Sequence, residues 1–117
     1  MGQSNSAARR TRLGTWRGVG IGTLLTGPAI LAAIMSGGAG HGSYITARVL
    51  FPFSMLLSQL EGVIGPVAMG VGLLQFPLYG ALIGRTVAAK TSWILLLATA
   101  HLVAVLACFS GLLPQFP

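Results

Sequence analysis

Stretches without charged residues divide the chain more clearly than any other pattern. They contain only apolar and uncharged polar residues apart from two histidines, and they cover residues 18–47, 49–60, 62–84 and 91–117. An α-helix needs about 20 mostly apolar residues to cross the roughly 30 Å hydrocarbon core of a membrane. The first, third and fourth stretches are long enough for a crossing, whereas the second, with twelve residues, is too short.

The first two stretches each predict one helix. The first helix covers residues 19–36 and ends where four glycines surround His41, because such a run is too flexible to stay helical. The second helix covers residues 44–60 and contains Pro52. It reaches a usable length only if Arg48 lies one turn inside it and extends its guanidinium toward water.

The last two stretches also predict one helix each. The third helix covers residues 63–84, and Pro77 is expected to kink its interior because proline removes a backbone hydrogen bond. The fourth helix begins after Thr91 or Ser92, either of which can cap it, and ends at residue 113 before a proline. The sequence therefore predicts a single helical membrane domain over residues 18–113 and a short C-terminal tail over residues 114–117.

The composition excludes an ordinary water-soluble domain. Hydrophobic residues make up 54% of the chain and charged residues only 7%, whereas about 25% of an average soluble chain is charged. Seven basic residues and one acid cannot cover the surface of a soluble domain. The expected partner is therefore the lipid bilayer, with four aromatic residues as interfacial anchors: Trp16, Tyr44, Trp93 and Phe116.

Basic residues gather before the first apolar stretch. Four of them, Arg9, Arg10, Arg12 and Arg17, lie in residues 1–17, which we expect to form a disordered basic N-terminal tail. Such residues remain on the cytoplasmic side of a membrane. We therefore expect a prokaryotic cytoplasmic membrane protein with a cytoplasmic N-terminus and a retained signal anchor. The net charge of +6 does not indicate a nucleic-acid partner, because no folded basic face is left to bind one.

Two membrane topologies fit the pattern. Four crossings from a cytoplasmic N-terminus place Arg85 and Lys90 outside, against the usual bias of basic residues. Three crossings place both inside if residues 44–60 enter the membrane and return to the same side, but such a segment must be buried in protein, of which a short chain offers little. We therefore expect an all-α integral membrane protein with four hydrophobic helices. The alternative is three transmembrane helices plus one re-entrant or interfacial helix.

Small residues recur at a helical spacing in the first and third predicted helices. Gly14, Gly18 and Gly22 are four residues apart, and Gly80 and Gly84 form a second such pair. A strip without side chains lets two helix backbones approach closely in a membrane. The five glycines predict a helix-packing surface, either within one chain or between copies.

Three polar side chains are the candidate functional residues, because polar groups are costly at membrane depth. Glu61, the only acid, would carry protons in a transporter with Gln59 or Gln75 as a polar neighbour, or would mark a surface turn between the second and third helices. His101 lies near the middle of the fourth helix, where it would serve a proton path or bond to another helix.

No residue pattern indicates catalysis, a cofactor or a metal. The chain contains no Asp, which excludes a Ser-His-Asp triad, and its histidines, Glu61 and Cys108 lack the spacing of a metal site. We therefore expect a small polytopic protein that is not an enzyme and acts as an accessory or structural component through helix packing, in a homo-oligomer or a larger membrane complex. The alternative is a subunit of a small oligomeric transporter or channel that uses Glu61 or His101 in a polar path.

Overall fold

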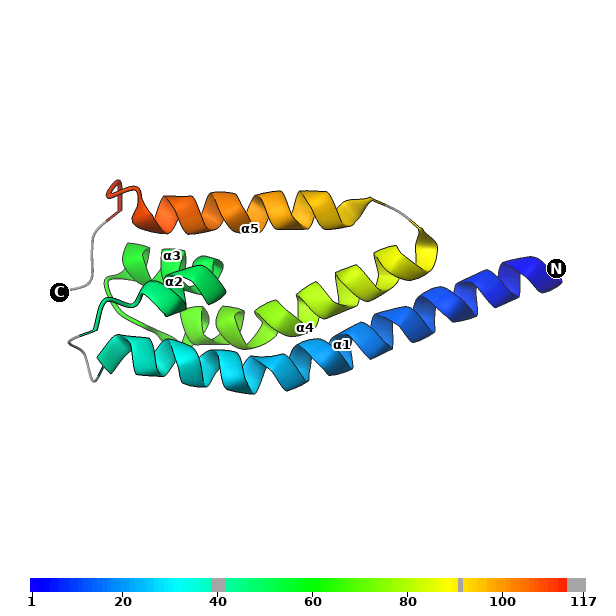
Figure 1. Ribbon diagram of the computed structural model, residues 1–117, viewed down its shortest axis with the longest axis horizontal. Coiled ribbons are helices and arrows are strands. Elements are labelled where there is room, and N and C mark those ends of the chain that lie inside the picture. The colour runs from blue at the N-terminus through cyan, green and yellow to red at the C-terminus, as the bar shows by residue number, and fades with distance from the viewer. Residues whose placement is uncertain (39–41, 91, 114–117) are drawn as a thin grey trace.

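The described part of the chain folds entirely into helices. The computed structural model describes residues 1–38, 42–90 and 92–113, and within these residues there are five helices and no strand (Figure 1). The helices are α1 Gly2–Gly37, α2 Ile45–Leu50, α3 Pro52–Glu61, α4 Pro66–Ala89 and α5 Trp93–Phe109. The expectation of an all-α chain is confirmed.

The helices form an elongated bundle of 59 × 25 × 19 Å. In Figure 1, α4 runs antiparallel to α1, and α5 runs antiparallel to α4. The short helices α2 and α3 lie between α1 and α5 at the end farthest from the N-terminus, and the first turns of α1 extend beyond the rest of the bundle. Of these helices, α1 and α4 are long and apolar enough to cross a membrane.

The N-terminal segment differs from the expected disordered tail, because α1 begins at Gly2 and includes residues 2–17. Four hydroxyl side chains of this segment donate to backbone carbonyls three or four residues earlier, among them Thr11 to the Ala7 carbonyl at 3.1 Å and Thr15 to the Thr11 carbonyl at 2.9 Å. The helix ends close to the predicted position, with Gly38 in the left-handed conformation at φ 49°. His41, expected in the following loop, lies outside the described residues.

The predicted second helix over residues 44–60 is wrong, because the segment is split into α2 and α3 at Phe51. Pro52 occupies the first position of α3, and the backbone of Phe51 leaves the helical region with φ −125° and ψ 55°. A proline disfavours the helical conformation of the residue before it, which explains a break at this position. The same break leaves the carbonyl groups at the end of α2 without their helical partners.

Together α2 and α3 lead into the bundle and back to the same end. The backbone N–H of Tyr44, just before α2, donates to the Ser36 carbonyl near the end of α1. Leu50, at the other end of α2, bonds to Gln75, which lies nine residues into α4 and so about 13 Å from the start of that helix. The chain then returns, because Ser54 of α3 bonds to the carbonyl of Ala68 in the first turn of α4.

The last two helices lie close to the predicted ranges but differ at their ends. Helix α4 begins at Pro66, continues through Pro77 and ends five residues beyond the predicted position 84. Helix α5 ends at Phe109 rather than at residue 113. Ser92 occupies the N-cap position of α5 but makes no side-chain capping hydrogen bond, and Thr91, the other expected cap, lies outside the described residues.

Few side chains are buried, and many large apolar side chains are exposed. The buried apolar residues gather largely where α2 and α3 pack against their neighbours, and they include Ala47, Phe51, Met55 and Cys108. Large side chains on α1 and α5 point outward, with Leu24 78% and Leu95 75% exposed. Large exposed apolar surfaces of this kind mark contacts with another protein or with a membrane.

Candidate functional site

The glycines of α1 and α4 face each other within one chain. Gly14 lies against Gly84 and Gly18 lies against Gly80, so that backbone contacts backbone. A Cβ atom added at Gly18 would overlap the carbonyl oxygen of Gly80, and one added at Gly22 would overlap that of Phe76. These approaches require residues without side chains, and they bring α1 and α4 together without any polar side chain.

The break between α2 and α3 forms the centre of a polar site, because it frees two neighbouring carbonyl groups. The side-chain amide of Gln75 from α4 donates to the Leu50 carbonyl at 2.7 Å, and Nε2 of His101 from α5 donates to the Val49 carbonyl at 2.9 Å. The structure therefore brings two of the three candidate polar residues together on adjacent backbone groups. Each supplies a donor that the interrupted helix lacks.

A tyrosine fixes the orientation of the histidine ring. The Tyr79 hydroxyl lies 2.7 Å from Nδ1 of His101, and in the tautomer whose Nε2–H donates to the Val49 carbonyl this hydroxyl is the donor to Nδ1. The Tyr79 ring also packs edge-on against the His101 ring and against Phe76, with centroid separations of 5.6 Å and 6.2 Å. The histidine thus links α5 to both α4 and the end of α2.

A second group of polar contacts lies between α3 and α5. Gln59, almost fully buried, donates from its side-chain amide to the Cys108 carbonyl at 3.2 Å. The Cys108 thiol lies 3.4 Å from the Pro52 carbonyl, the distance of a weak hydrogen bond. Among the described residues, the amide oxygens of Gln59 and Gln75 have no hydrogen-bond partner. These two buried side-chain oxygens can each still accept a hydrogen bond.

Glu61 lies apart from Gln75 and His101. It is an exposed residue at the end of α3, followed by Gly62 in the left-handed conformation at φ 72°. The structure therefore places it as the last residue of α3, directly before the turn that leads to α4. Arg48 is half-buried on α2 and lies over the Phe109 ring, with its guanidinium carbon 5.4 Å from the ring centroid, a cation–π geometry.

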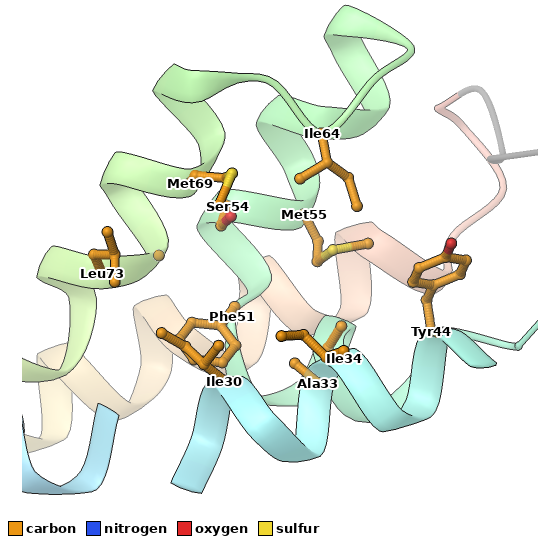
Figure 2. A pocket seen from close by; sticks show the side chains of 13 residues that line it. Ile30, Ala33, Ile34, Tyr44, Phe51, Ser54, Met55, Ile64, Met69 and Leu73 are labelled. Carbon is orange, nitrogen blue, oxygen red and sulfur yellow. The ribbon is translucent and has the colours of Figure 1, made fainter. Parts of the chain in front are cut away.

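An apolar groove lies beside the polar site, between α1, α3 and α4. It encloses about 360 Å³, and Figure 2 shows side chains from the three helices around it, among them Ile34, Met55 and Met69. Tyr44 lies at one side of the groove (Figure 2). The hydroxyl of Ser54, also in its wall, is bonded to the Ala68 carbonyl at 2.6 Å. The lining therefore suits a hydrocarbon chain better than a polar ligand.

Sequence reasoning did not single out Tyr79, and it named the buried Gln59 only as a polar neighbour of Glu61. Tyr79 carried a usable signal, because it lies four residues after Gln75 and thus on the same face of α4. The partners of both residues are backbone carbonyls or a residue on another helix, which sequence spacing does not reveal. Among the described residues, no group of three His, Cys, Asp or Glu side chains is placed to hold a metal ion.

Comparison with known proteins does not assign the chain to a family. No protein-family model, curated protein or solved structure matches the chain.

Proposed function

We propose that the chain is a small multi-pass protein of a prokaryotic cytoplasmic membrane and acts as an accessory or structural component through helix packing. The observation that carries the proposal is the use of the interior polar groups. Gln75, His101 and Gln59 each donate to a backbone carbonyl of this chain. Their hydrogen bonds hold the broken segment in place, which is a structural role, and none of the three donates to a second candidate polar residue.

The exposure of the long helices supports a location in lipid. Only 17% of the most apolar part of α1 is buried inside the bundle, and the same share holds for the most apolar part of α4. A core helix of a soluble protein would be mostly buried, so these helices do not fit that explanation. The close pairing of α1 with α4 also argues for a retained N-terminal helix, because a cleaved signal sequence needs no fitted partner in the mature protein.

The positions of the basic residues support three crossings with a re-entrant α2–α3 segment. Antiparallel pairing of α1 and α4 places Arg85 and Lys90 at the same end of the bundle as the N-terminal arginines. From Arg17 to Gly37, α1 rises about 30 Å, the thickness of a hydrocarbon core. In this topology the N-terminus and Lys90 are cytoplasmic, whereas Gly42, Gly62 and the end of α5 are on the outer side.

Reporter fusions test this arrangement directly. A reporter after Gly62 and one after Leu113 should be outside, and one after Lys90 should be inside. Four crossings reverse all three results, so the experiment separates the two topologies without ambiguity. A reporter after Gly42 is outside in both topologies and serves as the internal control, and an outside N-terminus would contradict both.

A transporter or channel subunit is the second candidate function, favoured by the two unpartnered amide oxygens. A buried acceptor without a partner costs about 1 to 3 kcal/mol, so Gln59 and Gln75 are places where water or an ion would bind. Purified protein in vesicles should show no proton or ion flux above empty vesicles under our proposal. A flux that disappears in Gln75→Leu, with the variant still folded and inserted, would establish the transporter instead.

A further inference from the structure

The basic residues form a narrow band at one end of the bundle. The glycine pairing sets the register of α1 against α4, and it places Arg12 level with Thr86 and Arg17 level with Ala81. The band therefore spans about 14 Å along the bundle axis, given a rise of 1.5 Å per residue. Six of the seven basic residues belong to it, and they are Arg9, Arg10, Arg12, Arg17, Arg85 and Lys90.

No acid balances this basic band. The only acid in the sequence is Glu61, which lies directly before the turn that leads to α4, at the opposite end of that helix from Arg85 and Lys90. Trp16 and Trp93 are both exposed and lie at the level of the basic band, where an indole ring suits the boundary between lipid headgroups and hydrocarbon. The basic band therefore has the composition of a surface that meets anionic headgroups.

An apolar cleft opens between α4 and α5 at the same end. It encloses about 260 Å³, with Leu82, Ile83 and Thr86 of α4 on one side and Trp93, Ile94 and Leu97 of α5 on the other. The hydroxyl of Thr86 donates to the Ile83 carbonyl at 2.9 Å, so its hydrogen is already bonded within α4. The cleft is therefore suited to a hydrocarbon chain.

Two cations are nearest in the chain to this cleft. Arg85 directly precedes Thr86, and Lys90 is the C-cap residue of α4, two residues before Ser92 at the N-cap position of α5. The remaining cations of the basic band are on α1, which packs against the opposite side of α4 from α5 (Figure 1). Neither cation lines the cleft itself, and Arg85 is displaced by about 100° around α4 from Thr86, so both belong to the end of α4 at which the cleft opens.

We propose that the cleft between α4 and α5 binds one anionic phospholipid, with an acyl chain against Leu82, Ile83 and Leu97 and the phosphate beside Arg85 and Lys90. The charge of the basic band selects an anion, and the apolar cleft selects a ligand that carries a long hydrocarbon chain. The site rests on the proposed membrane location. The α1 arginines contribute attraction to the anionic surface but do not form the site.

Binding to the full chain in a mild neutral detergent tests the site, with phosphatidylglycerol, phosphatidylcholine and inorganic phosphate as the three probes. Phosphatidylglycerol should bind and raise the thermal unfolding temperature, whereas the other two should do neither at the same concentration. Equal binding of phosphatidylcholine would overturn the role of the cations, and equal binding of inorganic phosphate would indicate a phosphate site without a lipid. Self-association that replaces lipid binding would indicate a second copy as the occupant.

Paired variants separate the site from general charge attraction. Arg85→Gln with Lys90→Gln should weaken phosphatidylglycerol binding about tenfold or more, whereas Arg9→Gln with Arg10→Gln, which removes the same charge from the basic band, should weaken it less than about threefold. Equal losses in the two pairs would overturn the proposal. Ala100→Phe, which keeps every charge and fills the cleft, should also abolish binding, and unchanged binding by a folded Ala100→Phe protein would contradict the acyl-chain position. Reporter fusions read the topology independently, so failure of the lipid site leaves that result intact.

Discussion

The α1–α4 half of the bundle and the half that contains α5 are held together by different kinds of contact. Helices α1 and α4 meet through glycines, with backbone against backbone over Gly14, Gly18 and Gly22. Helix α5 instead meets its neighbours through polar side chains, since His101 bonds to Tyr79 and to the Val49 carbonyl, and Gln59 bonds to the Cys108 carbonyl. At its start, α5 leaves an apolar cleft against α4 where no glycine pairing occurs.

In the proposed membrane location, this difference follows from the properties of an apolar solvent. Lipid chains are as apolar as leucine, so helices gain little from hiding apolar side chains and associate through close packing or hydrogen bonds. The continuous helix α4 satisfies its own backbone except for the hydrogen bond removed by Pro77, and it meets α1 through close packing. The broken α2–α3 segment leaves backbone carbonyls open, and in the proposed membrane location donors on neighbouring helices must bond to them in place of water.

The largest expected effect comes from the glycine-paired half. Gly18→Leu forces side-chain atoms into the backbone of Gly80, which cannot yield without separating α1 from α4, so we expect a loss of about 3 kcal/mol or more in stability. Thermal unfolding in mild detergent measures it. Gly20→Leu is the matched control, because a Cβ atom at Gly20 meets no atom within 4 Å. Equal stability of the two variants would show that the glycine pairing contributes nothing.

The next effect belongs to the polar half. Gln75→Leu keeps the approximate size of the side chain but leaves the Leu50 carbonyl without its donor, and we expect a loss of about 1 to 2 kcal/mol. Thr99→Val serves as the control, because the exposed Thr99 hydroxyl bonds only to a carbonyl of its own helix. If the two variants lose the same stability in the unfolding measurement, the break at Phe51 does not depend on Gln75.

A smaller effect is expected for the hydrogen bond between Tyr79 and His101. Tyr79→Phe removes one donor and should cost about 0.6 kcal/mol, the average reported for side-chain hydrogen bonds between membrane helices. The cost should disappear when His101 is replaced by Phe, because the hydroxyl then has no ring nitrogen to bond. A double-mutant cycle in detergent gives this coupling, and additive effects of the two substitutions would contradict the contact.

The smallest effect is expected at Glu61. Glu61→Gln should change stability by less than about 0.5 kcal/mol, since the residue is exposed at the end of α3. Cells that carry the Glu61→Gln protein should also not show the phenotype of cells in which the protein is deleted. A Glu61→Gln protein that inserts and folds normally yet reproduces the deletion phenotype, or abolishes proton flux in vesicles, would support the transporter and reject the structural role.

The sequence by itself determined the features that depend on local chemistry. The shortage of charge and the long apolar stretches predicted helices, and the glycine at every fourth position marked one face of α1. It also placed Pro52 inside the second predicted helix, and the rule that a proline disfavours helical backbone before it was available to predict the break at Phe51. These features need only neighbouring residues, because helical spacing and proline sterics act over a few positions.

Only the tertiary structure decided which distant residues meet. Nothing in the spacing of Gln75 and His101 indicated that they would bond to the adjacent carbonyls of Leu50 and Val49, because those carbonyls become available only through a break in another segment. The register of α1 against α4 likewise collected Arg17 and Arg85 into one band, although 67 residues separate them in the chain. Contacts of this kind depend on how whole helices pack, and the physical information that selects them lies in the assembled bundle rather than in any local stretch of sequence.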